Sequence, residues 1–169
     1  EAILQMLWQK TGVLYEFAGK AGAAIGLNEP DYAQHPTVQA VAEFTGKCGI
    51  AFQLQDDVLS IVGDTVKLGK KAGNDIREGK RTLIVMEALR RASPDERDFL
   101  IHTLGNHDAS DADVAQASAL LRSCGGIDHA KTVALRYVED ALKALEPLPD
   151  SEYKTLLKAW ADFIVKRDL

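Results

Sequence analysis

Apolar residues recur at steps of three and four along most of this chain, and this spacing constrains the fold more than any other feature. Such a spacing places apolar side chains on one face of a helix, whereas a half-buried strand requires strict alternation. No segment shows sustained alternation, internal repeats or a linker. We therefore expect an all-α protein in which residues 1–169 form a single domain.

The predicted helices are bounded by residues that commonly start or stop helices. Pro36 suits a first helical turn, and the SPDE sequence beginning at Ser93 has the form of a capping box. Asn28, Gly125 and Pro147 follow three of the apolar patterns and indicate helix ends. Helices are expected over residues 2–26, 36–63, 82–92, 93 onward, 111–123, 127–145 and 151 onward.

Residues 64–81 lack the helical spacing and carry three glycines, which predicts a long loop. Loops of this length in compact domains are often functional. The loop carries six lysines or arginines against three acids, although the whole chain has a formal net charge of -5. Glycine lets the backbone approach a ligand, and lysine supplies a compact positive charge. The loop therefore predicts an anion site; the alternative is a solvated charged loop.

Composition excludes several classes of protein. The net charge of -5 and the pI near 5.4 argue against nucleic-acid binding, which requires an excess of Lys and Arg. No apolar run is long enough for a transmembrane segment, and no signal-peptide pattern is present, so a cytoplasmic protein is the simplest interpretation. Cys48 and Cys124 lack CxxC spacing and are expected to be buried free thiols.

Polar residues interrupt the second apolar pattern at helical spacing. Gln53, Asp56, Asp57 and Ser60 fall on one face of a helix that is otherwise apolar. Adjacent carboxylates repel each other unless a cation takes up their charge, and Mg²⁺ is commonly held by one or two carboxylates together with substrate phosphates. The alternative for a lone Asp pair is a solvated acidic helix end.

Lys10 follows Leu7 by three residues and precedes Leu14 by four, so its stem is expected to point inward with the apolar side chains. A buried ammonium group requires an anion, unless the side chain reaches out to water. Thr11 adds a hydroxyl group beside this charge. Together with the acidic face and the basic loop, Lys10 favours a site for magnesium and diphosphate.

The run GKCGIAFQLQDDVLSIVGDTVKLGKKAGNDIREGKRTL resembles the second aspartate-rich region of the trans-isoprenyl diphosphate synthases, the family of farnesyl and geranylgeranyl diphosphate synthases. The resemblance includes the Phe52-Gln53 pair, the paired aspartates, the Gly69-Lys70 pair, and Lys80 ahead of a threonine. The segment KTGVLYEFAGKAGAAIG is similar to the lysine-threonine helix of the same family. The resemblance covers nearly the whole chain.

The resemblance implies the C-terminal half of the all-helical isoprenoid synthase fold and a Mg²⁺-dependent prenyltransferase. Such an enzyme condenses an allylic diphosphate with isopentenyl diphosphate to give farnesyl or geranylgeranyl diphosphate, and it acts as a homodimer. The implied roles are metal binding for Asp56 and Asp57, diphosphate binding for Lys10, Lys70 and Lys80, and contact with the developing carbocation for Thr11 and Gln53.

The chain departs from the family pattern in two respects. Ser60 stands where the second motif has a third aspartate, which removes one negative charge and predicts weaker metal binding. The first aspartate-rich motif has no counterpart here and is expected upstream of Glu1, so this segment alone is expected to be inactive.

Two alternative functions remain open at this point. One is a non-catalytic, synthase-like subunit or interaction protein, which Ser60 favours. The other is a related prenyl enzyme, either a terpene cyclase or a head-to-head condensing enzyme.

Overall fold

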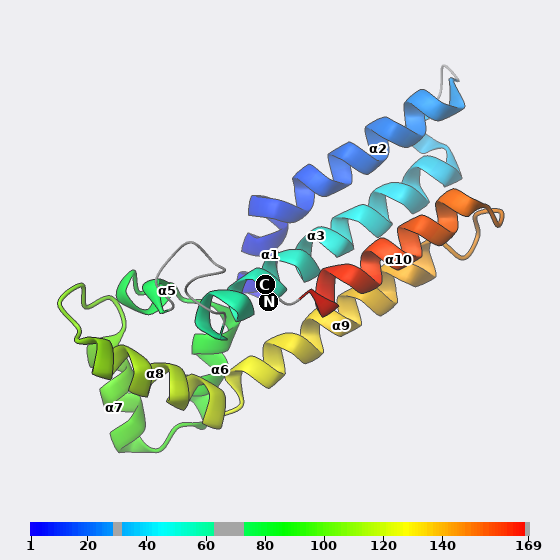
Figure 1. Ribbon diagram of the computed structural model, residues 1–169. Helices are drawn as coiled ribbons and strands as arrows, with labels where there is room; N and C mark the ends of the chain where they lie inside the picture. Colours follow the sequence, from blue (N-terminus) through cyan, green and yellow to red (C-terminus); the bar gives the residue numbers. More distant parts are fainter. Residues whose placement is uncertain (29–31, 63–72, 168–169) are drawn as a thin grey trace. The chain divides into compact units, whose positions relative to one another are not determined.

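The computed structural model describes residues 1–28, 32–62 and 73–167 (Figure 1). Within these ranges every regular element is helical, which confirms the all-α prediction. The chain divides into two compact units, one made of residues 1–53 and 133–167 and the other of residues 54–132. The expectation that residues 1–169 form one domain stays a prediction.

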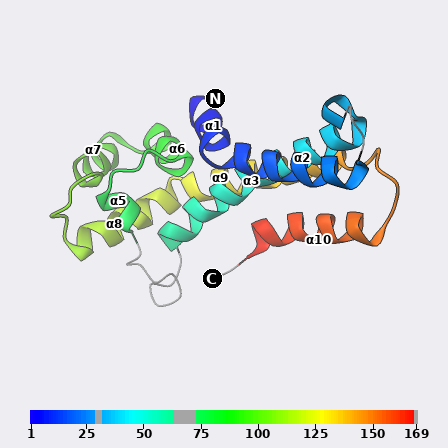
Figure 2. The same ribbon diagram turned by 90° about the horizontal axis from the view of Figure 1, so that it is seen from above.

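In the first unit, α2, α3 and α10 run alongside one another (Figures 1 and 2). Trp160 of α10 stacks on Tyr15 of α2 with ring centroids 6.0 Å apart, and it lies 5.9 Å from the ring of Phe44 in α3. This unit contains α1 (Ala2–Leu7), the π-helical turn η1 (Trp8–Gly12), α2 (Val13–Leu27), the 3-10 turn η2 (Tyr32–Gln34), the first part of α3 (Pro36–Val62), the second part of α9 (Gly126–Ala144), and α10 (Glu152–Lys166).

Small residues let α2 and the preceding turn lie close against α3. A Cβ atom at Gly49 would lie 2.9 Å from the Cα atom of Gly12, and one at Gly19 would lie 2.2 Å from the Thr45 hydroxyl. Real Cβ atoms do not approach other atoms so closely, so both positions require glycine. These glycines therefore bring α2 and the turn before it close to α3, and Tyr15 of α2 lies against Phe52 of α3 with ring centroids 5.6 Å apart.

This packing corrects the prediction for the first helical segment. Leu7 is buried as expected, at 2% exposed, but Leu14 and Phe17 are 65% and 70% exposed. The prediction assumed one continuous α-helix over residues 2–26, whereas the π turn over Trp8–Gly12 inserts extra residues into the helical repeat. The apolar stripe on either side of that turn therefore does not stay on one face.

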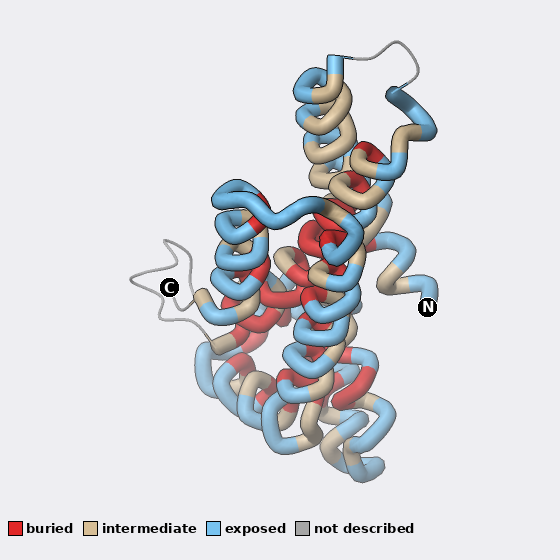
Figure 3. Tube along the Cα trace, turned by 90° about the vertical axis from the view of Figure 1, so that its right-hand side faces the viewer, coloured by how far each residue is buried: buried red, intermediate tan, exposed pale blue. Residues whose placement is uncertain are grey.

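In the second unit, α8 packs against α5, α6 and α7 around a core that includes Ile84, Leu100 and Leu121, all fully buried (Figure 3). Ser93 and Glu96 form the predicted capping box at the start of α7. A second box, formed by Ser110 and Asp113, begins α8. This unit contains the end of α3, α5 (Asn74–Arg77), α6 (Leu83–Arg91), α7 (Pro94–Thr103), α8 (Asp111–Ser123), and the start of α9.

Most predicted helix bounds agree with the structure to within one or two residues. The predicted loop over residues 64–81 is only partly described, and its residues 74–77 form the short helix α5 that was not expected.

Cys48 is a buried free thiol as predicted, and burial raises its pKa to about 12, whereas Cys124 is only half-buried. Within the described ranges, no helix combines the length and apolarity needed to cross a bilayer.

Candidate functional site

Two of the predicted site residues, 42 positions apart in sequence, meet in the first unit. The Thr11 hydroxyl in η1 donates a hydrogen bond of 2.9 Å to the side-chain carbonyl of Gln53 in α3. Gln53 is buried and Thr11 is half-buried. A threonine hydroxyl has a single hydrogen, so this bond fixes its direction and leaves the oxygen lone pairs as acceptors.

Arg167 places a positive charge over the ring of Phe52. Its guanidinium carbon lies 4.0 Å from the ring centroid of Phe52, the residue next to Gln53. Cations over aromatic faces are held by the charge distribution of the ring. Arg167 and Phe52 are 115 positions apart, so only the tertiary structure reveals this contact.

Lys10 is exposed, which corrects the expectation that its stem points inward. It belongs to the π turn, and the wider turn carries its side chain away from the face that contacts α3. An exposed ammonium group pays no desolvation cost and requires no buried anion. Lys10 can therefore serve as a ligand-binding charge without being a buried one.

The predicted metal ligands lie on the last two turns of α3, in the second unit. Asp56 is exposed and Asp57 is half-buried. Among the described residues, no three acidic, histidine or cysteine side chains converge on one point. Two neighbouring carboxylates are nevertheless a donor set that suits Mg²⁺, which takes its remaining oxygen ligands from water and substrate phosphates. The residues present thus fit the ion that the sequence predicted.

One turn further along α3, Ser60 is linked to Lys80 through Asp75 of α5. The Ser60 hydroxyl lies 2.7 Å from the Asp75 carboxylate, whose other oxygen accepts a hydrogen bond from the Lys80 ammonium group. Lys80 also pairs with Glu78 at 3.1 Å. The hydrogen bond to Asp75, followed by the one to Glu78, raises the pKa of Lys80 above its ordinary value. Lys80 therefore stays charged at neutral pH.

Sequence analysis did not single out Asp75 as a site residue. The only signal was its place in the loop segment that resembles the family motif, between two predicted lysines. Lys70, the third predicted diphosphate ligand, lies outside the described residues.

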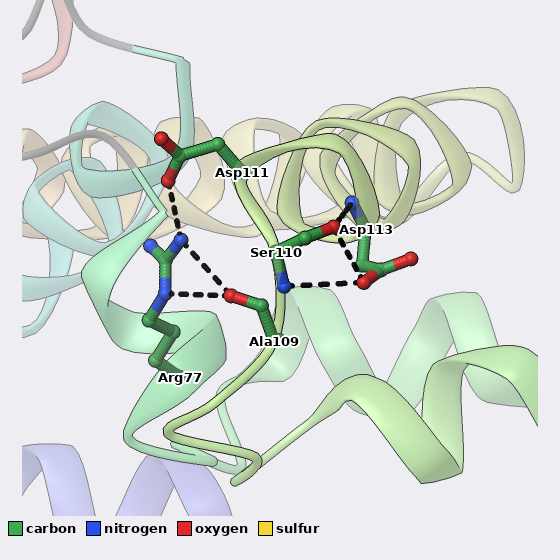
Figure 4. A network of polar contacts seen from close by, with 5 residues as sticks. All are labelled: Arg77, Ala109, Ser110, Asp111 and Asp113. Carbon is green, nitrogen blue, oxygen red and sulfur yellow. Dashed lines mark hydrogen bonds and ion pairs between the residues drawn. The ribbon is translucent and has the colours of Figure 1, made fainter.

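A second network holds α5 against the start of α8 (Figure 4). The Arg77 guanidinium donates to the Asp111 carboxylate at 2.6 Å and to the backbone carbonyl of Ala109 at 3.3 Å. Ser110 and Asp113 close the capping box immediately beyond it. Arg77 thus ties α5, the helix that carries Asp75, to the start of α8.

A groove of about 800 Å³ runs along α2 and η2 in the first unit. Its lining includes Phe17, Ile25 and Tyr32, and none of the predicted site residues. The geometry of the hydrogen-bonded motif residues, rather than this apolar groove, therefore identifies the candidate site.

Comparison with known proteins gives the same family as the motifs. The polyprenyl synthetase family model matches residues 1–121. A short chain isoprenyl diphosphate synthase of Methanothermobacter thermautotrophicus is 40% identical over 99% of this chain and 50% of its own length. A geranylgeranyl diphosphate synthase of Methanosarcina mazei is 35% identical over 98% of this chain and 48% of its own.

Solved structures agree. A polyprenyl synthase of Caulobacter crescentus, crystallised with calcium and isoprenyl diphosphate, has a TM-score of 0.89 at 33% identity, over 99% of this chain and 49% of that one. A geranylgeranyl pyrophosphate synthetase of Pyrococcus horikoshii has a TM-score of 0.82 at 37% identity, over 96% and 48%. This chain, which spans about half the length of these relatives, thus belongs to the polyprenyl synthetase family.

Proposed function

We propose that this chain supplies the C-terminal half of a short-chain isoprenyl diphosphate synthase. That enzyme condenses an allylic diphosphate with isopentenyl diphosphate and releases farnesyl or geranylgeranyl diphosphate. The observation that carries the proposal is the hydrogen bond between Thr11 and Gln53, which joins two separate motif segments. Similarity to short-chain and geranylgeranyl synthases over nearly the whole chain supports it.

In this proposal the allylic C–O bond breaks and the diphosphate leaves with the electron pair. The ammonium groups of Lys10, Lys70 and Lys80 bind the departing diphosphate and offset its negative charge. The double bond of isopentenyl diphosphate attacks the resulting carbocation, and loss of a proton restores a double bond. The Thr11 oxygen, whose hydrogen is committed to Gln53, presents lone pairs toward positive charge.

Asp56 and Asp57 are the residues that would hold Mg²⁺. When bound, the ion supplies positive charge to the diphosphate leaving group. The relative from Caulobacter crescentus was crystallised with a divalent cation and isoprenyl diphosphate, which supports this assignment. Homodimer formation and a cytoplasmic location stay predictions that rest on the family resemblance.

The test is reconstitution of prenyl transfer. The chain is co-expressed with the first half of the Methanothermobacter synthase, and incorporation of labelled isopentenyl diphosphate into longer prenyl diphosphates is measured. We expect Mg²⁺-dependent product, and we expect Asp56→Ala to reduce it by at least about 100-fold, since metal-assisted charge stabilisation is lost. The matched control is Asp95→Ala, which removes an exposed carboxylate from the first turn of α7.

A non-catalytic subunit is the second candidate, because Ser60 replaces the third acid of the motif. For that function, the chain would raise the activity of an active synthase, and Asp56→Ala would act like Asp95→Ala. Near-normal turnover by Asp56→Ala would thus reject the catalytic assignment.

A further inference from the structure

Ser60 makes a contact that its family counterpart, an aspartate, could not make. Its hydroxyl oxygen lies 2.7 Å from the Asp75 carboxylate and 2.9 Å from the backbone carbonyl of Asp57. A serine has one hydroxyl hydrogen, and a charged acceptor binds it more strongly than a neutral carbonyl. The hydrogen is therefore donated to Asp75.

A carboxylate at position 60 would abolish this contact. Two carboxylates at such a separation repel each other, so an ionised aspartate at position 60 would turn away from Asp75. Asp75 would then lose the donor that holds one of its oxygens, while its other oxygen binds the Lys80 ammonium group. A neutral hydrogen-bond donor at position 60 thus helps to hold the Asp75 carboxylate in this place.

Asp75 in turn determines where the Lys80 ammonium group lies. The side chain of Asp75 is 15% exposed and that of Lys80 is 47% exposed, so the carboxylate is the fixed partner and the lysine the accessible one. The backbone N–H of Lys80 also donates to the Asp75 carbonyl at 3.0 Å. An ammonium group has three N–H donors. Among the described residues, Asp75 and Glu78 take two of them, and the third is available to a ligand.

We propose that Ser60 is a positioning residue, which acts through Asp75 to hold the Lys80 ammonium group where a diphosphate oxygen binds. The inference rests on the proposed function for the identity of the ligand. It reverses the expectation from charge alone, in which replacing the third aspartate by serine only weakens the site. The serine removes one negative charge from the motif and, through Asp75, fixes the position of the Lys80 ammonium group.

The test compares Ser60→Ala, Ser60→Asp and Ser60→Thr. Calorimetry measures the affinity for inorganic pyrophosphate in the presence of Mg²⁺, with the 169-residue chain alone and with the first half of the Methanothermobacter synthase. We expect binding about three- to tenfold weaker for Ser60→Ala, the scale of one typical hydrogen bond, because Ser60 acts on the lysine only through Asp75, and at least as weak for Ser60→Asp. Ser60→Thr keeps the hydroxyl and is expected to bind like the parent.

The sign of the Ser60→Asp effect decides between the two explanations. If position 60 acts only through charge at the metal, Ser60→Asp binds Mg²⁺ and pyrophosphate more tightly than the parent, and the proposal is overturned. Ser93→Ala is the matched control, because it removes a hydroxyl-to-carboxylate bond in the same unit at the start of α7, away from Asp75. It is expected to lower stability without changing pyrophosphate affinity.

A second readout does not depend on catalysis. NMR titration of the Lys80 ammonium group in the chain alone is expected to give a lower pKa in Ser60→Ala than in the parent, since Asp75 is then less firmly held. Unchanged Lys80 titration overturns the proposal and leaves the proposed function intact. If the parent chain binds no pyrophosphate, either alone or with the first half of the Methanothermobacter synthase, the proposed function fails. The role of Ser60 in diphosphate binding then fails with it.

Discussion

Helices α2 and α8 have similar lengths, 15 and 13 residues, but opposite environments. Both lie wholly in the described part of the chain. α8 buries Val114, Ala117 and Leu121, whereas no residue of α2 is buried. Leu14, Phe17 and Ile25 of α2 are 65%, 70% and 80% exposed.

The comparison shows that apolar spacing defines a helix face without defining what covers it. The face of α8 is covered by helices of its own unit, so burial of its side chains stabilises the fold. α2 instead approaches α3 through Gly19 and Tyr15, which leaves Leu14, Phe17 and Ile25 outward. The same substitution in the two helices should therefore have very different consequences.

The largest expected effect is that of Leu121→Ala in α8. Leu121 is fully buried, so truncation removes apolar contacts and leaves a cavity. We expect the free energy of unfolding to fall by about 2–5 kcal/mol. Chemical denaturation followed by circular dichroism measures the change, and a loss below about 1 kcal/mol would contradict the closed core around α8.

Ser110→Ala should have an intermediate effect. Ser110 begins α8 with a capping box, whereas α2 has no side-chain cap at its start. Loss of the cap is expected to lower the free energy of unfolding by about 0.5–2 kcal/mol. Ser123→Ala, at the other end of α8, is the control: its hydroxyl is exposed and makes only a 3.4 Å bond. Equal effects of the two variants would argue against the cap.

A smaller, pH-dependent effect is expected from Glu87 of α6. Hydrogen bonds from Arg90, and then from Arg91, lower the pKa of the Glu87 carboxyl from 4.5 to about 2. The unfolded state therefore takes up a proton at a higher pH than the folded state, and the stabilisation is full above pH 4.5. It is lost as the pH falls from about 4.5 to about 2.

The Glu87 effect should stay below about 1 kcal/mol, because the side chains of Arg90 and Arg91 are 67% and 48% exposed and water screens the pairs. The measurement is the free energy of unfolding against pH for the parent and for Glu87→Gln. The difference between them is expected to shrink toward low pH. A constant difference would show that the ionisation of Glu87 does not contribute.

Leu14→Ala should have the smallest effect. It makes the same chemical change as Leu121→Ala, but at a side chain that is 65% exposed. The expected change in the free energy of unfolding of this chain is within about 0.5 kcal/mol, as for other surface substitutions. A loss near that of Leu121→Ala would mean that the outer face of α2 is covered in solution.

Helix bounds were predicted well because the signals that set them are local. The capping box at Ser93 and Glu96 lies within four residues, and Pro36 begins α3 by its own fixed backbone angle. The π turn over Trp8–Gly12 was missed because nothing in its sequence marks it. That omission also produced the wrong expectation for Lys10 and for the face of α2.

The candidate site likewise has features that the sequence predicted and features that it did not. The residue types and their spacing indicated the family and predicted roles for Asp56, Asp57 and Lys80, since Mg²⁺ and diphosphate require oxygen ligands and positive charges; the family is shown, and the roles stay predictions. The pairing of Thr11 with Gln53 was not predicted, nor were the contacts of Asp75 and Arg167. Each of these contacts joins side chains that are distant in sequence.

The sequence alone thus determined the all-α class, most helix ends and the family, because each depends on neighbouring residues, on composition or on local motifs. Only the tertiary structure decided which helix faces are covered and that Ser60 holds Asp75 against Lys80. The reason is physical: burial and hydrogen bonding depend on distances in space. Asp75, the side chain that Ser60 contacts, lies 15 positions away along the chain, and Lys80, which Asp75 binds in turn, lies 20 positions from Ser60.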